Sequence, residues 1–185
     1  MTTQKLISLR EIAGRSRQLR AEGRRVVLCH GTFDLMHTGH IRYLQRAKQE
    51  GDVLLVTVTG DAYVNKGPGR PVFNELLRAE NLAALACVDF VAVNHAVSAV
   101  EALHEICPNI YAKGSDYRSH GDDVTGNIAR EQEAVEAHGG HIFYTDEITF
   151  SSSNLLNEHF NVFPPETKEF LRGFRSRWSD KEIQS

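Results

Sequence analysis

Two histidines, His37 and His40, follow a short apolar segment and a glycine-containing turn. Residues 26–29 are typical of a buried strand, and the residues from Thr38 onward predict a helix. A parallel strand that leads into a helix N-terminus is a common phosphate site, because the first N–H groups of a helix have no partner within it. Imidazoles three residues apart can face one ligand, and each can donate to a phosphate oxygen, neutral or charged. This strand, turn and helix start with His37 and His40, here called the histidine corner, therefore predict a polyphosphate site.

The first helical turn strengthens this interpretation. Thr38 is expected to be the N-cap, and Gly39, which has no side chain, lets a phosphate group approach the backbone. The same two histidines could instead bind zinc, but a structural zinc site needs two more ligands, and no Cys/His cluster is close in the sequence. Nucleotidyl transfer needs mainly positioning and electrostatic stabilisation, which such a corner can provide.

Residues 31–40, Gly-Thr-Phe-Asp-Leu-Met-His-Thr-Gly-His, resemble the first-strand motif of the nucleotidyltransferase superfamily whose hallmark is His-x-Gly-His. Residues 66–71, 78–89, 113–117 and 150–153 are similar, in the same order, to sugar-phosphate nucleotidyltransferases, notably the adenylyltransferase domain of ADP-heptose synthases. Residues 146–152 lack the arginine and glycine of the glycerol-phosphate cytidylyltransferases, which counts against glycerol phosphate as the acceptor. An insertion at residues 119–126, beside the expected base pocket, leaves the preferred base and the acceptor sugar open.

The resemblance implies a role for each matched residue. The catalytic set it implies is His37, His40, Lys66 and Arg78, with the histidines on the α-phosphate and the two cations on the β- and γ-phosphates. The implied nucleotide-binding residues are Gly31, Thr32, Phe33, Asp34, Gly39, Lys113, Gly114, Asp116, Ser151, Ser152 and Ser153. Asp61, Arg70 and Tyr117 would bind the acceptor. Mg²⁺ would accompany the nucleotide with few protein ligands.

Several of these residues also have an ordinary structural interpretation. Lys66 and Arg70 flank glycines and a proline, so they are either a mobile cationic arm or the solvated charges of an exposed loop. Arg78, on a predicted helix, would without the resemblance be a surface arginine, and Asp34 and Asp61 can simply cap turns. The serines can act as helix N-caps and as an anion site at once.

The leading hypothesis is a nucleotidyltransferase that moves a nucleoside monophosphate from a nucleoside triphosphate, ATP favoured, to a sugar 1-phosphate such as heptose 1-phosphate. One alternative is a CTP-dependent cytidylyltransferase that acts on glycerol 3-phosphate or another polyol or sugar phosphate. A second is a nucleotide-binding regulatory module without turnover. The resemblance also implies a homodimer and a sugar kinase that is fused or separate.

Chain length, net charge and cysteine spacing limit which of these functions and locations are compatible with the sequence. A chain of 185 residues is long enough for one domain with a real core, and its net charge of −3 gives no support for nucleic-acid binding. The three cysteines, Cys29, Cys87 and Cys107, have no Cys-x-x-Cys spacing and are expected to be buried, reduced thiols. With no signal peptide or membrane-spanning apolar run recognised in the sequence, a cytoplasmic protein is expected.

Strand and helix patterns alternate along the chain, which predicts a Rossmann-like α/β three-layer sandwich with a five-stranded parallel sheet. Strands are expected at residues 25–30, 52–59, 88–93, 109–112 and 141–145, and helices at 8–23, 38–49, 74–86, 98–106, 127–137 and 152–159. The expected organisation is an N-terminal helix over 1–24, a nucleotidyltransferase domain over 25–160 and a helical tail or linker over 161–185. Each matched motif follows a strand, so all should meet at one edge of the sheet.

Overall fold

A computed structural model describes residues 4–66, 69–114, 127–146, 166 and 169. The chain divides into two compact units, Met1–Thr149 and Phe150–Ser185, and the sheet lies within the first. The predicted boundary at residue 160 and the helix predicted over 152–159 lie outside the described residues.

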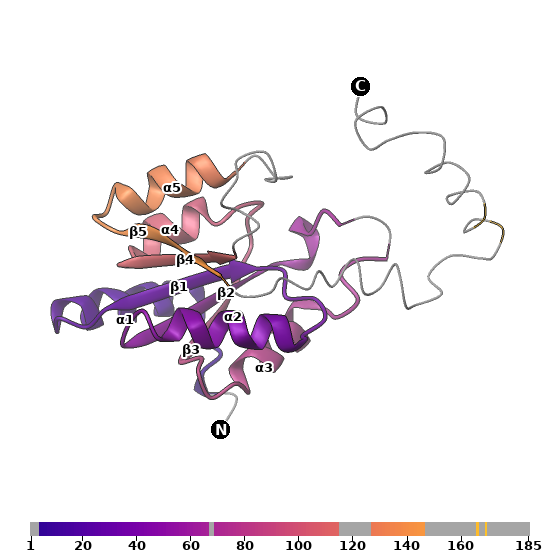
Figure 1. The fold of residues 1–185 in the computed structure, drawn as a ribbon, viewed down its shortest axis with the longest axis horizontal. Coiled ribbons are helices and arrows are strands. Elements are labelled where there is room, and N and C mark those ends of the chain that lie inside the picture. The colour runs from indigo at the N-terminus through magenta and orange to yellow at the C-terminus, as the bar shows by residue number, and fades with distance from the viewer. Residues whose placement is uncertain (1–3, 67–68, 115–126, 147–165, 167–168, 170–185) are drawn as a thin grey trace. The chain divides into compact units, whose positions relative to one another are not determined.

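Five parallel strands form one sheet in the order β3-β2-β1-β4-β5 (Figure 1). The strands are β1 (Val26–Gly31), β2 (Val53–Thr59), β3 (Phe90–Asn94), β4 (Ile110–Gly114) and β5 (His141–Thr145). The central strand β1 pairs with β2 from Val26↔Val53 onward and with β4 from Val27↔Ile110. The predicted Rossmann-like α/β class, with five parallel strands, is confirmed.

Helices cover both faces of the sheet. They are α1 (Leu9–Ala21), α2 (Thr38–Lys48), α3 (Glu75–Ala83), α4 (Val100–Ile106) and α5 (Ile128–Glu136), with a short 3₁₀ helix η2 (Asp61–Tyr63) after β2. The helices α2 and α3 pack with one core cluster, and α1, α4 and α5 pack with the other. Every residue of β2 is buried, because alternate side chains enter opposite cores: Leu54, Val56 and Val58 enter one, and Val53 and Leu55 the other.

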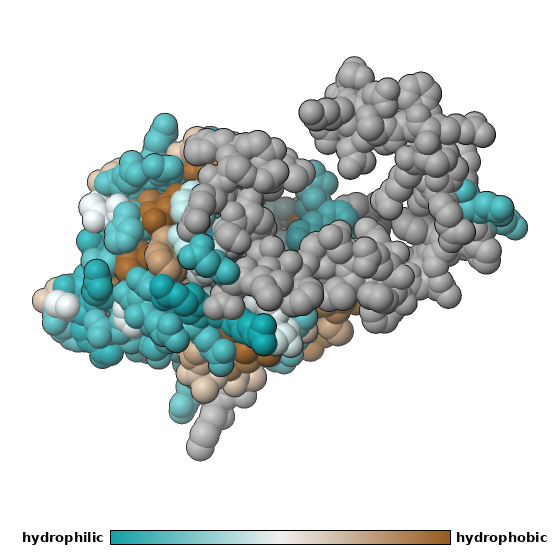
Figure 2. Space-filling view, in the orientation of Figure 1, coloured by the Kyte–Doolittle hydropathy of each residue, from teal (hydrophilic) through white to brown (hydrophobic). Residues whose placement is uncertain are grey.

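The N-terminal residues add a contact that periodicity did not predict. Leu6 forms a parallel bridge with Val91 of β3, and the side chain of Lys5 donates to the backbone carbonyls of Leu85 and Val88. At the other edge, Figure 2 shows hydrophobic surface over β5, between the hydrophilic outer faces of α2 and α5, where Ile142 and Phe143 are half-buried. No helix in the described part of the chain combines the length and apolar character needed to cross a bilayer.

Candidate active site

His37 caps the helix that begins the site. Its backbone is extended, and its Nδ1 accepts the N–H of Gly39 at 3.1 Å. The expectation that Thr38 is the N-cap is therefore wrong: Thr38 is the first helical residue, because the imidazole one position earlier reaches the N–H that a Ser or Thr side chain would otherwise satisfy. In a neutral ring that accepts through Nδ1, the proton lies on Nε2, which makes Nε2 a donor.

His40 stacks on His37 and is held neutral. The two ring centroids lie 3.9 Å apart with an interplanar angle of 27°, and the ring of Phe33 meets His40 edge-on at 5.5 Å. Burial, and after it the neighbouring His37 and Lys66, lowers the pKa of His40 to about 4. At neutral pH His40 can therefore donate to a phosphate oxygen only as an uncharged imidazole, the neutral form that the sequence had left open.

The turn between β1 and α2 brings the other predicted corner residues together. Gly31 ends β1, and a Cβ at this position would lie 3.2 Å from the Phe33 ring. Phe33 itself is buried and has a φ of 49°. Gly39 is buried in the first turn of α2. The structure thus places Gly31, Phe33 and Gly39 beside the histidine pair, and their predicted contact with the nucleotide stays a prediction.

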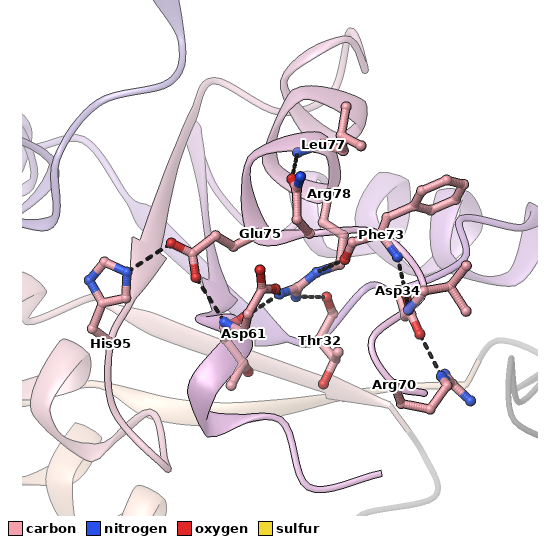
Figure 3. A network of polar contacts seen from close by, with 12 residues as sticks. Thr32, Asp34, Asp61, Arg70, Phe73, Glu75, Leu77, Arg78 and His95 are labelled. Carbon is pink, nitrogen blue, oxygen red and sulfur yellow. Dashed lines mark hydrogen bonds and ion pairs between the residues drawn. The ribbon is translucent and has the colours of Figure 1, made fainter. Parts of the chain in front are cut away.

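Asp34 anchors the basic loop that follows η2. Its carboxylate accepts the Arg70 Nε–H at 2.6 Å and the backbone N–H groups of Val72 and Phe73 at 2.7 and 3.1 Å (Figure 3). The Asp34 side chain is only 1% exposed and that of Arg70 11%. Arg70 Nη2 is buried and has no hydrogen-bond partner within the described residues, whereas Lys66 is exposed. Two residues that were predicted as ligands, Asp34 and Arg70, therefore contact each other.

Arg78 is fully buried beneath the site. Its guanidinium donates to the carbonyls of Phe73, Thr32 and Thr59 at 2.9, 2.5 and 2.8 Å, and Nη2 also donates to Asp61 Oδ1 at 2.7 Å (Figure 3). Thr32 follows β1 and Thr59 ends β2, so one side chain links the carboxyl ends of two neighbouring strands. The predicted contact of Arg78 with the β- and γ-phosphates stays a prediction, since in this arrangement the guanidinium faces protein carbonyls.

Two further residues extend this network. Glu75 accepts the Asp61 backbone N–H at 2.8 Å, and its other carboxylate oxygen lies 3.1 Å from Nε2 of His95 (Figure 3). The hydrogen bond from Asp61, followed by the one from His95, lowers the pKa of Glu75. No sequence motif includes His95 or Glu75, and an acidic residue in the first turn of a helix has an ordinary explanation in the helix dipole.

Lys113 and Gly114 end β4, on the other side of β1. Lys113 is buried and forms an ion pair with Glu131 of α5 at 2.8 Å. Glu131, which contacts this predicted site residue, was not predicted from the sequence. Asp116, Tyr117, Ser151, Ser152 and Ser153 were predicted to bind ligands and lie outside the described residues.

Carboxylates near the histidine corner are already engaged. Asp34 and Asp61 each accept from an arginine. Within residues 4–66, 69–114 and 127–146, no group of three or more His, Cys, Asp or Glu side chains is arranged to hold a metal ion. The corner therefore offers phosphate-binding donors and nearby cations: the α2 N-terminus, two imidazoles, Lys66 and Arg70.

Comparison with known proteins finds relatives that are similar in sequence to much of the chain. The bifunctional protein HldE of Geobacter metallireducens is 34% identical over 168 residues, which are 88% of this chain and 32% of that protein. HldE of Pelobacter propionicus is 41% identical over 125 residues, 66% of this chain and 24% of that protein. The chain thus spans about a quarter to a third of the length of these relatives.

Solved structures agree with the fold. The lipopolysaccharide core biosynthesis protein of Thermoplasma volcanium is 27% identical, with a TM-score of 0.57 over 69% of this chain and 100% of that chain. A pantoate-beta-alanine ligase from Francisella tularensis is 15% identical, with a TM-score of 0.58 over 95% of this chain and 80% of that chain, and it shows the fold alone.

The family model agrees with the motifs and with the geometry. Residues 28–159 match the cytidylyltransferase-like family, and this range contains the histidine corner, the basic loop and the end of β4. The predicted superfamily and the predicted enzyme class are confirmed by this match and by the HldE relatives. The chain belongs to the cytidylyltransferase-like family of nucleotidyltransferases.

Proposed function

We propose that this chain transfers a nucleoside monophosphate from a nucleoside triphosphate to a sugar 1-phosphate and releases pyrophosphate. The observation that carries the proposal is the histidine pair at the α2 N-terminus, where His37 is held by the Gly39 N–H and His40 stacks on it as a neutral ring. Two imidazole donors at the positive end of the α2 dipole suit an α-phosphate whose negative charge grows in the transition state.

The cations of the neighbouring loop would hold the rest of the triphosphate. Lys66 is exposed. Asp34 orients Arg70 through the Nε–H, and Nη2 of Arg70 has no hydrogen-bond partner within the described residues, so it can donate to a ligand. These groups would bind the β- and γ-phosphates and the departing pyrophosphate. The acceptor phosphate is already ionised at neutral pH, so it can attack the α-phosphorus in line without a strong general base.

Mg²⁺ belongs in this proposal as part of the metal–nucleotide substrate. The nearby carboxylates of Asp34 and Asp61 are occupied by arginines. Phosphate oxygens and water would therefore supply most of its ligands, as is usual for this ion.

ATP and heptose 1-phosphate are the first candidates for the two substrates. The motif resemblance to the adenylyltransferase domain of ADP-heptose synthases supports them, as does the solved relative named a lipopolysaccharide core biosynthesis protein. Relatives that are called bifunctional and are much longer fit a sugar kinase, fused or separate, as a companion activity. We also propose the homodimer and the cytoplasmic location that the sequence led us to expect.

A cytidylyltransferase that uses CTP and a polyol or sugar phosphate is the second candidate, favoured by the family match. The test is pyrophosphate release in the presence of Mg²⁺, with ATP, CTP, GTP and UTP each paired with heptose 1-phosphates, other sugar phosphates and glycerol 3-phosphate. Release with ATP and a heptose 1-phosphate is expected. Release with CTP alone would move the assignment to the second candidate, and nucleotide binding without release from any pair would favour a regulatory module.

A further inference from the structure

Three polar side chains form a buried cluster at the carboxyl end of β4. Tyr111 and Lys113 are two residues apart, so they share a face of the strand, and Glu131 reaches them from α5. Lys113 Nζ lies 2.8 Å from Glu131 Oε2 and 3.2 Å from Tyr111 Oη, and Tyr111 Oη donates to Glu131 Oε2 at 3.0 Å. The side chains of Lys113 and Glu131 are 9% and 5% exposed.

The Glu131 carboxylate joins three elements. Besides its bonds to the two β4 side chains, its Oε1 accepts the backbone N–H of Ala99 at 3.3 Å, directly before α4. A buried charge is tolerated only when it is paired, so Lys113 and Glu131 depend on each other. Loss of the Glu131 charge removes the carboxylate that lies 2.8 Å from the buried Lys113 ammonium.

This cluster borders the place where a ligand is expected. β1 and β4 are neighbours in the sheet, but the chain leaves β1 towards α2 on one face and leaves β4 towards α5 on the other. Parallel α/β sheets bind ligands in the crevice at such a switch point, outside the carboxyl ends of the strands. Lys113 therefore stands on the β4 side of that crevice, and the histidine corner stands on the β1 side.

We propose that Glu131 is a positioning residue for the nucleotide: it neutralises Lys113 and fixes the β4 side of the crevice. The inference rests on the proposed function, because it takes the nucleotide as the ligand of that crevice. It differs from the motif-based expectation for Lys113. If Lys113 binds the nucleotide directly, its charge is indispensable, whereas in a positioning pair a neutral couple that keeps the same packing can replace both charges.

Four variants separate these two roles. Glu131→Gln keeps the shape and the acceptor for Tyr111 but removes the charge, Lys113→Met removes the ammonium, and the double variant removes both. Glu133→Gln, at an exposed position on the same helix, is the matched control. Each single change in the pair is expected to raise the KM for the nucleoside triphosphate by about tenfold or more, with kcat within about threefold, and the double variant to return to within about threefold of the wild-type KM.

Hydrogen exchange of the amides of residues 110–114, measured without ligand, supplies a readout that does not depend on turnover. Faster exchange in Glu131→Gln than in Glu133→Gln is expected. A double variant that keeps the high KM of Lys113→Met at wild-type melting temperature would overturn the proposal and make Lys113 a direct ligand. Equal exchange and equal KM in the two glutamine variants would overturn it as well. Absence of pyrophosphate release by the wild type would count against the proposed function, and the exchange comparison would still decide whether Glu131 fixes this edge.

Discussion

Replacement of Arg78 by methionine should destabilise the fold far more than a surface substitution does. The guanidinium is fully buried and donates to three backbone carbonyls, those of Thr32, Thr59 and Phe73, and to the Asp61 carboxylate. Methionine has a similar length but no donor, so the three carbonyls lose a partner where water has little access. The ends of β1 and β2 and the segment before α3 then lose their common link.

The magnitude follows from those contacts. A buried carbonyl left without a donor costs about 1–3 kcal/mol, although relaxation and water entry reduce the sum over neighbouring groups. The Asp61 side chain is 39% exposed and regains water, so its loss adds little. We expect the free energy of unfolding to fall by about 3–5 kcal/mol, comparable to the removal of one partner from a buried ion pair. For a chain of this size that corresponds to a melting temperature lower by about 6–20 °C.

The assay is urea and thermal unfolding of Arg78→Met beside Arg130→Met, a control at an exposed position on α5. Arg78→Lys should lie between the wild type and Arg78→Met, because a single ammonium cannot reproduce the forked contacts. An Arg78→Met protein within about 1 kcal/mol of the wild type, with a KM for the nucleoside triphosphate raised about a hundredfold, would refute the reasoning. Arg78 would then act as the phosphate ligand that the sequence predicted.

Three further predictions follow from the same structure. Asp34→Asn removes the charge paired with Arg70 and should lower the free energy of unfolding by about 3 kcal/mol in urea; a loss below about 1 kcal/mol would contradict a structural role for that pair. Gly140→Ala should lower the free energy of unfolding by about 2 kcal/mol or more, because the new Cβ would lie 2.4 Å from the Pro108 carbonyl oxygen. Gly14→Ala, which has open space around it in α1, should raise the free energy of unfolding by about 0.5–1 kcal/mol. Equal melting temperatures of the two variants would contradict the close contact at Gly140. Burial is the main cause that lowers the pKa of both His30 and His40 to about 4, so the unfolded chain binds protons before the folded chain as the pH falls. The contribution of each histidine to the free energy of unfolding should be complete above about pH 6.5. It should be lost towards pH 4, by up to about 3 kcal/mol per histidine. His30→Asn should flatten the plot of unfolding free energy against pH, and an unchanged slope would contradict the shift.

Local sequence signals were sufficient for the sheet and for the corner of the site. The apolar run of β2 and the alternation of strand and helix patterns predict a buried parallel sheet, and the structure has each predicted strand within about two residues. The histidines and the glycines are positioned by one turn between adjacent elements, so their proximity needs no long-range information. Thr38 was mistaken for the N-cap because side-chain type at one position cannot show that the preceding imidazole caps the helix first.

The buried polar network could not be predicted in this way. Arg78 meets Thr32 across 46 residues of sequence and Asp61 across 17, and Lys113 meets Glu131 across 18. A cation on an amphipathic helix, or at the end of a strand, has the same local signature whether it faces a ligand, a carbonyl or a carboxylate. Which partner it meets depends on how the helices pack on the sheet, and periodicity does not contain that information.

The histidine corner is the centre of this account, and one measurement tests it most directly. Pyrophosphate release and nucleotide binding should be compared for the wild type, His40→Ala and, as a control, His141→Ala, which lies at an exposed position on β5. If His40 stabilises charge on the α-phosphate in the transition state, His40→Ala should lower turnover by about 10²–10³-fold while the dissociation constant of the nucleotide changes only a few-fold. Equal losses in turnover and in affinity would show that His40 only binds the ground state, and wild-type turnover would place the reaction away from this corner.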